Sequence, residues 1–148
     1  MSEIIFQGTS DLTLDDKGRI TVPARHRDAL TDPAGIAGHL TITKHPNGCL
    51  MVFPRHVWLD FRGKLTLLSA AAEGWRRIFV GSAVDLDIDA AQRVLVPPEL
   101  RTWAALDKKL RLVGMGSRFE LWDAARYDEQ EARVMAAPMP DALQSMVY

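Results

Sequence analysis

The chain has little of what secreted domains and membrane proteins need. Its 148 residues include one cysteine, Cys49, so it cannot form an internal disulfide bond. No apolar run approaches the roughly 18 residues of a membrane-spanning helix. The first ten residues lack a basic start followed by an apolar stretch, which a secretory signal has. These absences predict a cytoplasmic protein with no membrane partner.

Catalytic and metal-binding patterns are also missing. The sequence has no Gly-x-Ser-x-Gly element, no phosphate-binding glycine loop and no convincing pairing of a nucleophile with a base. Four potential metal ligands fall within eighteen residues, namely His39, His45, Cys49 and His56. Their spacing matches neither a Cys-x-x-Cys nor a His-x-x-x-His pattern. We therefore expect no catalytic residue, no metal and no cofactor.

The net charge is small, but the charged residues are segregated along the chain. The net charge is −1, which does not favour a polyanionic partner. However, residues 17–27 hold four basic side chains and no acid, whereas residues 119–131 hold five acids and one arginine. The first segment is therefore the candidate surface for a nucleic acid.

One sequence element occurs twice, seventy-four residues apart. Residues 14–30 are LDDKGRITVPARHRDAL and residues 88–104 are IDAAQRVLVPPELRTWA. Each copy contains Asp-x-x-x-Arg, an apolar run, a proline and a helix-like segment. In the first copy Gly18 supplies a backbone free to take a positive φ, and Pro23 suits the first turn of a helix over residues 24–30. The pattern predicts strand, turn, strand and short helix in each copy.

The remainder of each copy follows the same order. After a loop at residues 31–38, the first copy predicts strands at 39–44 and 49–53 and a helix after Pro54. The second predicts strands at 109–114 and 118–122 and a helix over 124–136 with Asp123 as N-cap. Residues 68–83 indicate a helix end and a linker or second helix. The tail from Pro138 is expected to be weakly ordered.

The two copies resemble the MraZ proteins. The resemblance rests on the paired Asp-x-x-x-Arg elements, on residues 51–54 (MVFP) and on residues 119–123 (FELWD), and it runs from Phe6 to about residue 135. It implies an α+β fold of two pseudo-repeated SpoVT-AbrB-type units, whose swapped hairpins interlock into small β-barrels with short helices. The expected boundaries are 9–56 and 83–126 for the units, 57–82 for a helical linker and 127–148 for a C-terminal helix and tail.

The resemblance also implies a function. MraZ proteins are bacterial transcriptional regulators that form ring-shaped homo-oligomers and bind short direct repeats in double-stranded DNA. Those repeats lie upstream of their own gene, in the cluster for division and cell-wall genes. The implied location is cytoplasmic or nucleoid-associated, and the implied partners are promoter DNA and further copies of the chain.

The first copy supplies the candidate DNA-binding residues Lys17, Arg19, Arg25 and Arg27. Arg19 lies at a predicted exposed turn, and arginine pairs with guanine through two hydrogen bonds, so we expect it to contact a base. Lys17 is expected to contact phosphate. For Arg25 and Arg27, phosphate contact and a solvated helix face remain open alternatives.

Three further residues are predicted to be structural. Asp15 and Asp89 are expected to fix their turns, because a carboxylate that faced a phosphate would be repelled by it. Arg93 is expected to be structural too, since its neighbourhood carries no net positive charge. The second copy also lacks the turn glycine and the lysine. The first copy is therefore expected to carry most of the DNA contact.

Two other function classes make different demands on the sequence. An antitoxin-like protein-binding module would predict a long disordered C-terminal arm, and this tail is short. A small hydrolase is disfavoured by the missing catalytic groups. Assembly is expected because each unit is too small to bury a core alone. Four tryptophans should pack in the core or between subunits: Trp58, Trp75, Trp103 and Trp122.

Overall fold

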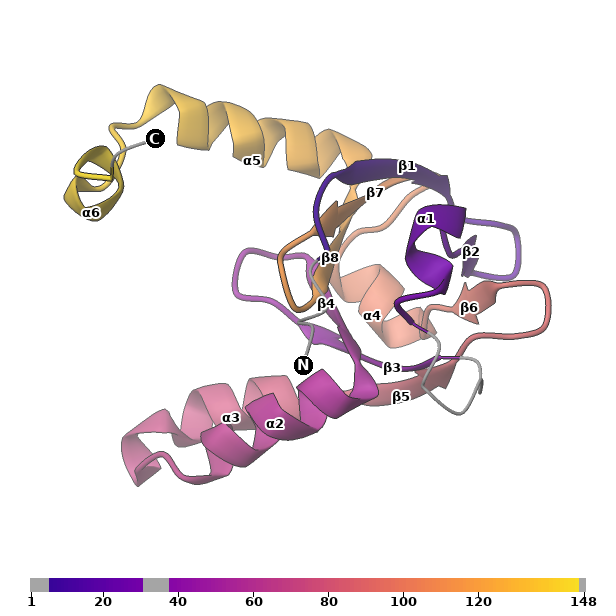
Figure 1. The fold of residues 1–148 in the computed structure, drawn as a ribbon, viewed down its shortest axis with the longest axis horizontal. Helices are drawn as coiled ribbons and strands as arrows, with labels where there is room; N and C mark the ends of the chain where they lie inside the picture. The colour runs from indigo at the N-terminus through magenta and orange to yellow at the C-terminus, as the bar shows by residue number, and fades with distance from the viewer. Residues whose placement is uncertain (1–5, 31–37, 147–148) are drawn as a thin grey trace.

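The computed structural model of the chain describes residues 6–30 and 38–146. They combine helices with antiparallel strands, as expected for the predicted α+β class (Figure 1). In chain order they are β1 (Thr9–Thr13), β2 (Arg19–Thr21), α1 (Ala24–Arg27), β3 (His39–Lys44), β4 (Leu50–Pro54), α2 (Arg55–Thr66), η1 (Ala70–Ala72), α3 (Glu73–Gly81), β5 (Val84–Asp87), β6 (Arg93–Leu95), α4 (Pro98–Trp103), β7 (Lys109–Gly114), β8 (Phe119–Asp123), α5 (Ala124–Ala136) and α6 (Asp141–Gln144).

The strands of the two repeats pair with one another. A six-stranded antiparallel sheet has the order β1-β7-β8-β4-β3-β5, and β2 and β6 form a separate two-stranded ribbon. The strand, turn and strand expected at the start of each repeat are present, but β1 pairs with β7 rather than with β2. An isolated two-stranded hairpin is marginal in water. Exchanging strands lets each repeat complete the sheet of the other.

The strand registers repeat about an approximate twofold axis. In the ribbon, Arg19 lies opposite Leu95, Ile20 opposite Val94, and Thr21 opposite Arg93. Ile20 and Val94 are equivalent positions of the two repeats, and the ribbon is centred on this pair. The β4–β8 ladder is centred in the same way, on Met51 and Glu120. The sequence repeat is thus a repeat of structure.

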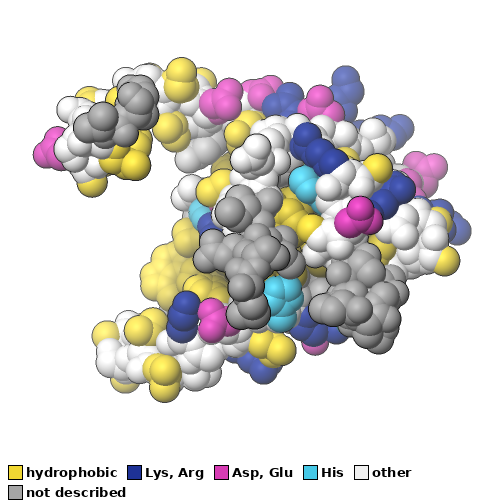
Figure 2. Space-filling view, viewed as in Figure 1, with side chains coloured by type: hydrophobic (Ala, Val, Ile, Leu, Met, Phe, Trp, Pro, Cys, Tyr) yellow, Lys and Arg dark blue, Asp and Glu magenta, His cyan; other side chains and the backbone are white. Residues whose placement is uncertain are grey.

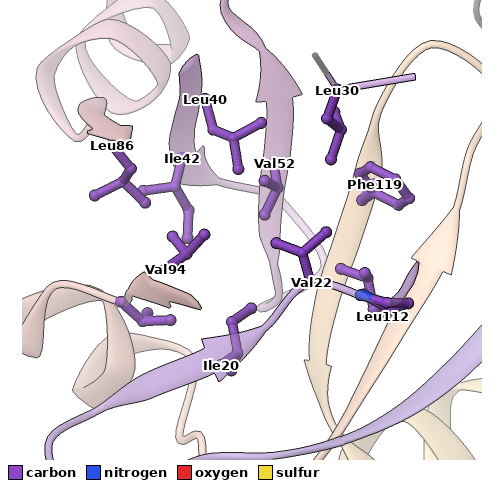
Figure 3. Close-up of a pocket in the computed structure, with 12 residues that line it drawn as sticks. Ile20, Val22, Leu30, Leu40, Ile42, Val52, Leu86, Val94, Leu112 and Phe119 are labelled. Atoms are coloured by element: carbon purple, nitrogen blue, oxygen red, sulfur yellow. The ribbon is translucent and has the colours of Figure 1, made fainter. Parts of the chain in front are cut away.

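The ribbon closes one side of the main core. Ile20 and Val94 are buried, as is Val22 just beyond β2. Figure 3 shows them directed into a small apolar cavity that strands of the six-stranded sheet also line. Because side chains alternate along a strand, the neighbours of Ile20 and Val94 face outward. Packing from within therefore fixes which ribbon residues reach the surface.

The longer helices project from the strands. α2 and α3 lie side by side and extend away from the sheets, and α5 leads to α6 as a second projection (Figure 1). Asp123 accepts a hydrogen bond from the Arg126 N–H, so its predicted N-cap role is confirmed. Trp58 and Trp122 are buried, whereas Trp75 and Trp103 are substantially exposed. The tryptophans are therefore not all core residues.

One expectation needs correction, and one cannot be compared. The helix expected over residues 24–30 is shorter, because α1 ends at Arg27. The tail from Pro138 contains the short exposed helix α6, which follows Pro140, and its weak order stays a prediction. The expected loop at 31–38 lies almost wholly outside the described residues. Within the described ranges, no helix combines the length and apolarity that a bilayer crossing requires.

Candidate nucleic-acid interface

The first Asp-x-x-x-Arg element folds into a closed turn. The Asp15 carboxylate accepts hydrogen bonds from the backbone N–H of Lys17 at 2.9 Å and of Arg19 at 2.8 Å. Its second oxygen accepts from Arg19 Nε at 2.8 Å. The backbone hydrogen bond from Arg19 is the main reason that the pKa of Asp15 is lowered. The aspartate is therefore held ionised, and it orients the arginine through Nε.

The second element repeats this geometry. Asp89 accepts hydrogen bonds from the N–H groups of Ala91 and Arg93, both at 2.9 Å, and from Arg93 Nε at 3.3 Å. Its pKa is also lowered, mainly by the backbone hydrogen bond from Arg93. The structure thus brings together the two Asp–Arg pairs that the sequence spacing joins. In both pairs the bond uses Nε, which leaves the two terminal guanidinium nitrogens outside it.

Each turn is also anchored to the other repeat. The Gly18 carbonyl accepts the Val96 N–H at 2.9 Å, and the Gln92 carbonyl accepts the Val22 N–H at 2.8 Å. Gly18 has a φ of +82° and Gln92 a φ of +62°, so both lie in the left-handed region. The two turns are therefore preorganised by matching hydrogen bonds across the ribbon.

The outward face of the ribbon carries both arginines. Arg19 and Thr21 alternate with buried Ile20, and Arg93 and Leu95 alternate with buried Val94, so these four side chains share the outer face. Arg19 lies directly opposite Leu95, which places Arg93 on the diagonal. Residues on such a diagonal are about 7–8 Å apart at the Cα atoms. Two guanidinium groups are thus presented together on a rigid two-stranded support.

The remaining predicted basic residues lie in the first turn and on α1, and their side chains differ in whether they are bonded within the chain. Lys17 is exposed at the tip of the first turn. Arg25 donates hydrogen bonds to Ser10 Oγ at 2.5 Å and to His26 Nε2 at 3.2 Å. Arg27 donates from Nε to the Val22 carbonyl at 3.2 Å. The side chains of Arg25 and Arg27 are therefore both engaged within the chain.

One basic residue near the first turn escaped sequence reasoning. Arg101, on α4 of the second repeat, lies so close to Gly18 that a Cβ atom there would collide with its guanidinium. Arg101 is the equivalent of Arg27, and that equivalence was the available signal. Figure 2 shows Lys and Arg side chains over the end that carries β2, β6 and α1, with acids among them. The first turn therefore draws basic groups from both repeats.

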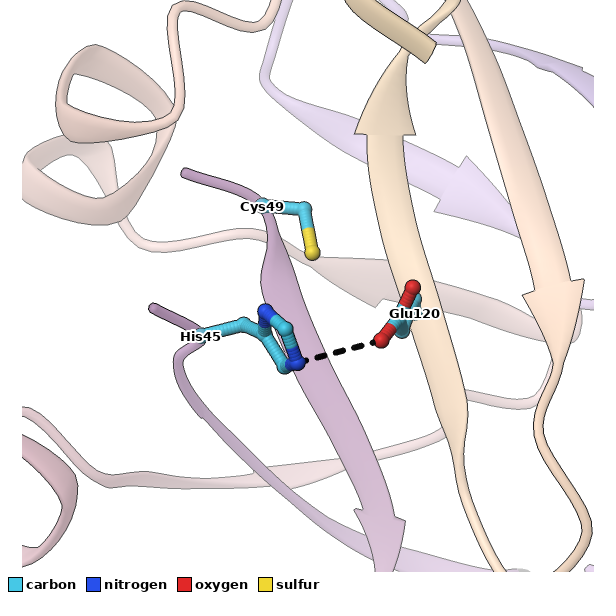
Figure 4. Close-up of side chains that lie close together, drawn as sticks. All are labelled: His45, Cys49 and Glu120. Atoms are coloured by element: carbon cyan, nitrogen blue, oxygen red, sulfur yellow. Dashed lines mark ion pairs between the residues drawn. The ribbon is translucent and has the colours of Figure 1, made fainter. Parts of the chain in front are cut away.

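A separate cluster joins His45, Cys49 and Glu120, with ligand-type atoms within 4.8 Å of one another (Figure 4). The Asn47 N–H donates to His45 Nδ1 at 3.0 Å, so the ring proton lies on Nε2, which is 3.3 Å from Glu120. Burial lowers the pKa of His45 and raises that of the Cys49 thiol. The ring nitrogens are thus already engaged and the thiol is protonated, which favours a structural role.

Glu120 is the member of this cluster that sequence spacing did not reveal. It reaches the other two from β8, across the β4–β8 ladder, and accepts a hydrogen bond from Trp122 Nε1 at 3.0 Å. Arg118 lies 3.7 Å from the same carboxylate. The remaining histidines of the sequence group lie elsewhere: His39 pairs with Asp87 at 2.6 Å, and His56 is exposed on α2. The four potential ligands of the sequence therefore do not converge.

Comparisons with known proteins agree over the whole chain. A family model for the MraZ protein, described as antitoxin-like, matches residues 5–78 and again residues 79–147. A protein of Leptothrix cholodnii named "Transcriptional regulator MraZ" is 55% identical over 148 residues, which is all of both chains. A protein of the same name from Methylibium petroleiphilum is 58% identical over 143 residues, or 97% of each chain. Acidovorax sp. strain JS42 has one that is 54% identical over 144 residues.

Proposed function

Because the chain belongs to the MraZ family, a family of transcriptional regulators and not of enzymes, we propose that it is a sequence-specific DNA-binding regulator. The observation that carries this proposal is the outward face of the β2–β6 ribbon. There Arg19 and Arg93 lie on one diagonal of a support that both repeats build. Each arginine is oriented by its own aspartate, at 2.8 and 3.3 Å.

A two-stranded ribbon suits the major groove of DNA. The groove is about 12 Å wide and admits such a ribbon, and guanine presents two acceptors there that match an arginine. Orientation by Asp15 and Asp89 reduces the side-chain entropy lost on binding. The aspartate carboxylates bond to the guanidinium Nε atoms and to backbone N–H groups of their own turns. This arrangement supports base contact by Arg19, with Arg93 as a second contact.

Other basic residues supply the sequence-independent part of binding. Lys17 is exposed beside Arg19 and is proposed to contact phosphate. Arg25 and Arg27 lie on α1, next to the ribbon, and are proposed to line the same phosphate path. Arg101 adds charge at the first turn, whereas Ala91 occupies the position equivalent to Lys17. The first repeat is therefore still proposed to contribute more binding free energy than the second.

Assembly of several copies is proposed to raise the affinity for DNA, because several ribbons then bind at once. The projections carry exposed apolar side chains, among them Trp75 and Ile78 on α3 and Met135 and Leu143 on the α5–α6 segment. Large exposed apolar side chains that cluster mark interaction surfaces. A ring of copies, built from interlocked hairpin barrels, would present many ribbons to short direct repeats. Tethered contacts then raise the effective concentration of each ribbon at the next repeat.

The proposed target is the promoter of the chain's own gene and of the division and cell-wall cluster. The proposed location is the cytoplasm, in association with the nucleoid. An antitoxin-like protein-binding role is the second candidate, and the exposed apolar side chains of α5 and α6 favour it. In that case the chain would form a stoichiometric complex with a protein partner and would bind DNA no more tightly at one sequence than at another.

The test is a binding titration with the DNA upstream of the protein's own coding sequence. A shuffled duplex of the same length and composition is the control. We expect preferential binding of the upstream duplex and a steep fall in affinity with salt, because several phosphates are neutralised together. A second series with one, two and three repeats should show affinity rising with repeat number. Equal affinity for the upstream and shuffled duplexes would overturn the proposal.

A further inference from the structure

We propose that Leu95 is a specificity-determining residue that contacts the 5-methyl group of a thymine, next to the base contacted by Arg19. This inference rests on the proposed DNA-binding function, which it deepens. Leu95 is 50% exposed although it lies between two buried residues, Val94 and Val96. Packing of those neighbours forces the leucine outward, onto the same face as the arginines.

The position of Leu95 argues for a DNA contact. It lies directly opposite Arg19 across the ribbon and two residues from Arg93 along β6, on the same outer face. Asp15 and Asp89 balance the charges of these arginines, but each engages only the Nε atom, so the terminal nitrogens lie outside the pair and can donate to the acceptor groups of DNA. An exposed leucine contributes no burial free energy while it faces water. It contributes such free energy to binding if the ligand of the arginines places an apolar group against it.

DNA offers one such group in the major groove. Thymine is the base that displays a methyl group there, and apolar side chains contact it. Cross-strand neighbours in a sheet have Cβ atoms about 5 Å apart, and successive base pairs are about 3.4 Å apart. A guanine contact by Arg19 and a methyl contact by Leu95 therefore fit neighbouring base pairs. The cross-strand pair would read two adjacent positions.

The equivalent position in the other half of the ribbon differs. Thr21 occupies it, opposite Arg93. Threonine is shorter than leucine, and its hydroxyl is satisfied by water or by a polar base edge. The two halves therefore present the same arginine with different neighbours. Threonine can still offer its own methyl group to a thymine, but a smaller one than leucine. Although the backbone is nearly twofold symmetric, the ribbon would therefore prefer an asymmetric site, with the stronger methyl preference on the Leu95 side.

The experiment uses the full-length protein and the upstream duplex, with deoxyuridine replacing each thymine in turn. This replacement removes the methyl group and leaves the base-pairing edge intact. Burial of one methyl is worth about 0.8 kcal/mol, or about a fourfold change in affinity. We expect the affinity of the wild type to fall about fourfold when deoxyuridine replaces one particular thymine of a repeat. Leu95→Ala should bind the thymine duplex and the deoxyuridine duplex with equal affinity. Leu95→Met should keep the wild-type preference for thymine.

Leu67→Ala is the matched control, because Leu67 is an exposed leucine at the end of α2, outside the ribbon. It should keep the wild-type ratio between thymine and uracil duplexes. Wild type that is indifferent to every methyl group, or Leu95→Ala that keeps the full preference, would overturn the Leu95 assignment while leaving DNA binding intact. If wild type shows no sequence preference at all, the proposed function itself fails, and this inference with it.

Discussion

Gln92 holds the same left-handed backbone conformation as Gly18, the residue at the equivalent position of the first repeat. Both residues close the turn before a ribbon strand, and both carbonyls accept a hydrogen bond from the opposite repeat. For glycine this conformation costs little, whereas a residue with a Cβ atom loses roughly 1–2 kcal/mol. The second repeat thus has the same left-handed turn conformation with glutamine in place of glycine.

Replacing Gln92 with glycine should therefore stabilise the protein. We expect a gain of about 0.5–1 kcal/mol in the free energy of unfolding, since the relieved strain is partly offset by the greater flexibility of glycine in the unfolded chain. Denaturant titration measures it. Ala91→Gly, in the same turn, is the control and should destabilise. No gain at Gln92 would mean that its side chain contributes more than the strain costs.

Local structure could largely be predicted from the sequence. The strands predicted at 39–44 and 109–114 have those bounds in the structure, because alternating apolar residues and turn residues at their ends mark them. The cap at Asp123 and the repeat of two units were likewise predictable from short patterns. Each of these features depends on residues that are close in the chain.

Contacts between repeats could not be predicted. Pairing of β1 with β7 joins residues about a hundred positions apart, and no local pattern names the partner. The same holds for Arg101 over Gly18 and for Glu120 beside His45. Sequence reasoning placed Arg19 and Arg93 in separate turns with different roles. Their shared face follows from the register of β2 against β6, which only the folded chain sets.

Asp123→Ala should destabilise the C-terminal half. The carboxylate accepts the Arg126 N–H at 3.3 Å and the Asp107 N–H at 3.1 Å, so it joins the start of α5 to the loop before β7. Loss of a cap costs about 1 kcal/mol, and loss of a hydrogen bond to a charged group costs about 1.5–3 kcal/mol. We expect a loss of roughly 1–3 kcal/mol by denaturant titration. Asp128→Ala, in an exposed pair with Arg111, should lose under about 1 kcal/mol.

The pH dependence of stability should depend on His26. Burial, and secondarily the charge of Arg25, lower the pKa of His26 below its usual 6.5. The unfolded chain then binds the proton more readily, so stability is complete above about pH 6.5 and declines as the pH falls below it. His26 packs against Phe6 and Phe119, with ring centroids 5.7 and 4.8 Å away. The protonated ring is therefore poorly accommodated.

His26→Leu is the natural substitution, because Leu100 occupies the equivalent buried position in the second repeat. Denaturant titrations at about pH 7.5 and 5.5 should show a smaller loss of stability on acidification than in wild type. Some loss should remain, since burial also lowers the pKa of His45. His56→Gln, at an exposed position on α2, should keep the wild-type dependence. An unchanged slope in His26→Leu would exclude His26 as a major source.

The exposed apolar residues of the C-terminal segment should support assembly. Met135 is 82% exposed and Leu143 is 45% exposed. If copies of the chain cover these side chains, a charge there must be buried without a partner, which costs several kcal/mol. Light scattering should show an oligomer for wild type and smaller species for Met135→Glu and Leu143→Glu. Ala125→Glu, exposed at the start of α5, adds the same charge and should leave the oligomer intact.

Comparing Arg19→Ala with Arg93→Ala tests how much each arginine contributes to DNA affinity. Arg19→Ala should weaken binding to the upstream duplex by about 1–3 kcal/mol, the usual worth of a guanine contact. Arg93→Ala should cost less, because Ala91 stands where the first turn has Lys17. Both Asp–Arg pairs are partly exposed, with arginine side chains 25% and 37% accessible, so neither variant should lose more than about 1 kcal/mol of stability.

Binding isotherms and melting curves on the same preparations separate the two effects. Lys17→Ala adds a further distinction, since loss of a phosphate contact should weaken binding to upstream and shuffled duplexes alike and reduce the salt slope by about one. Arg19→Ala should instead reduce the difference between those duplexes, because a base contact carries the sequence preference. If Arg93→Ala loses more affinity than Arg19→Ala, the second repeat is the principal reader of the DNA sequence and the first repeat is secondary.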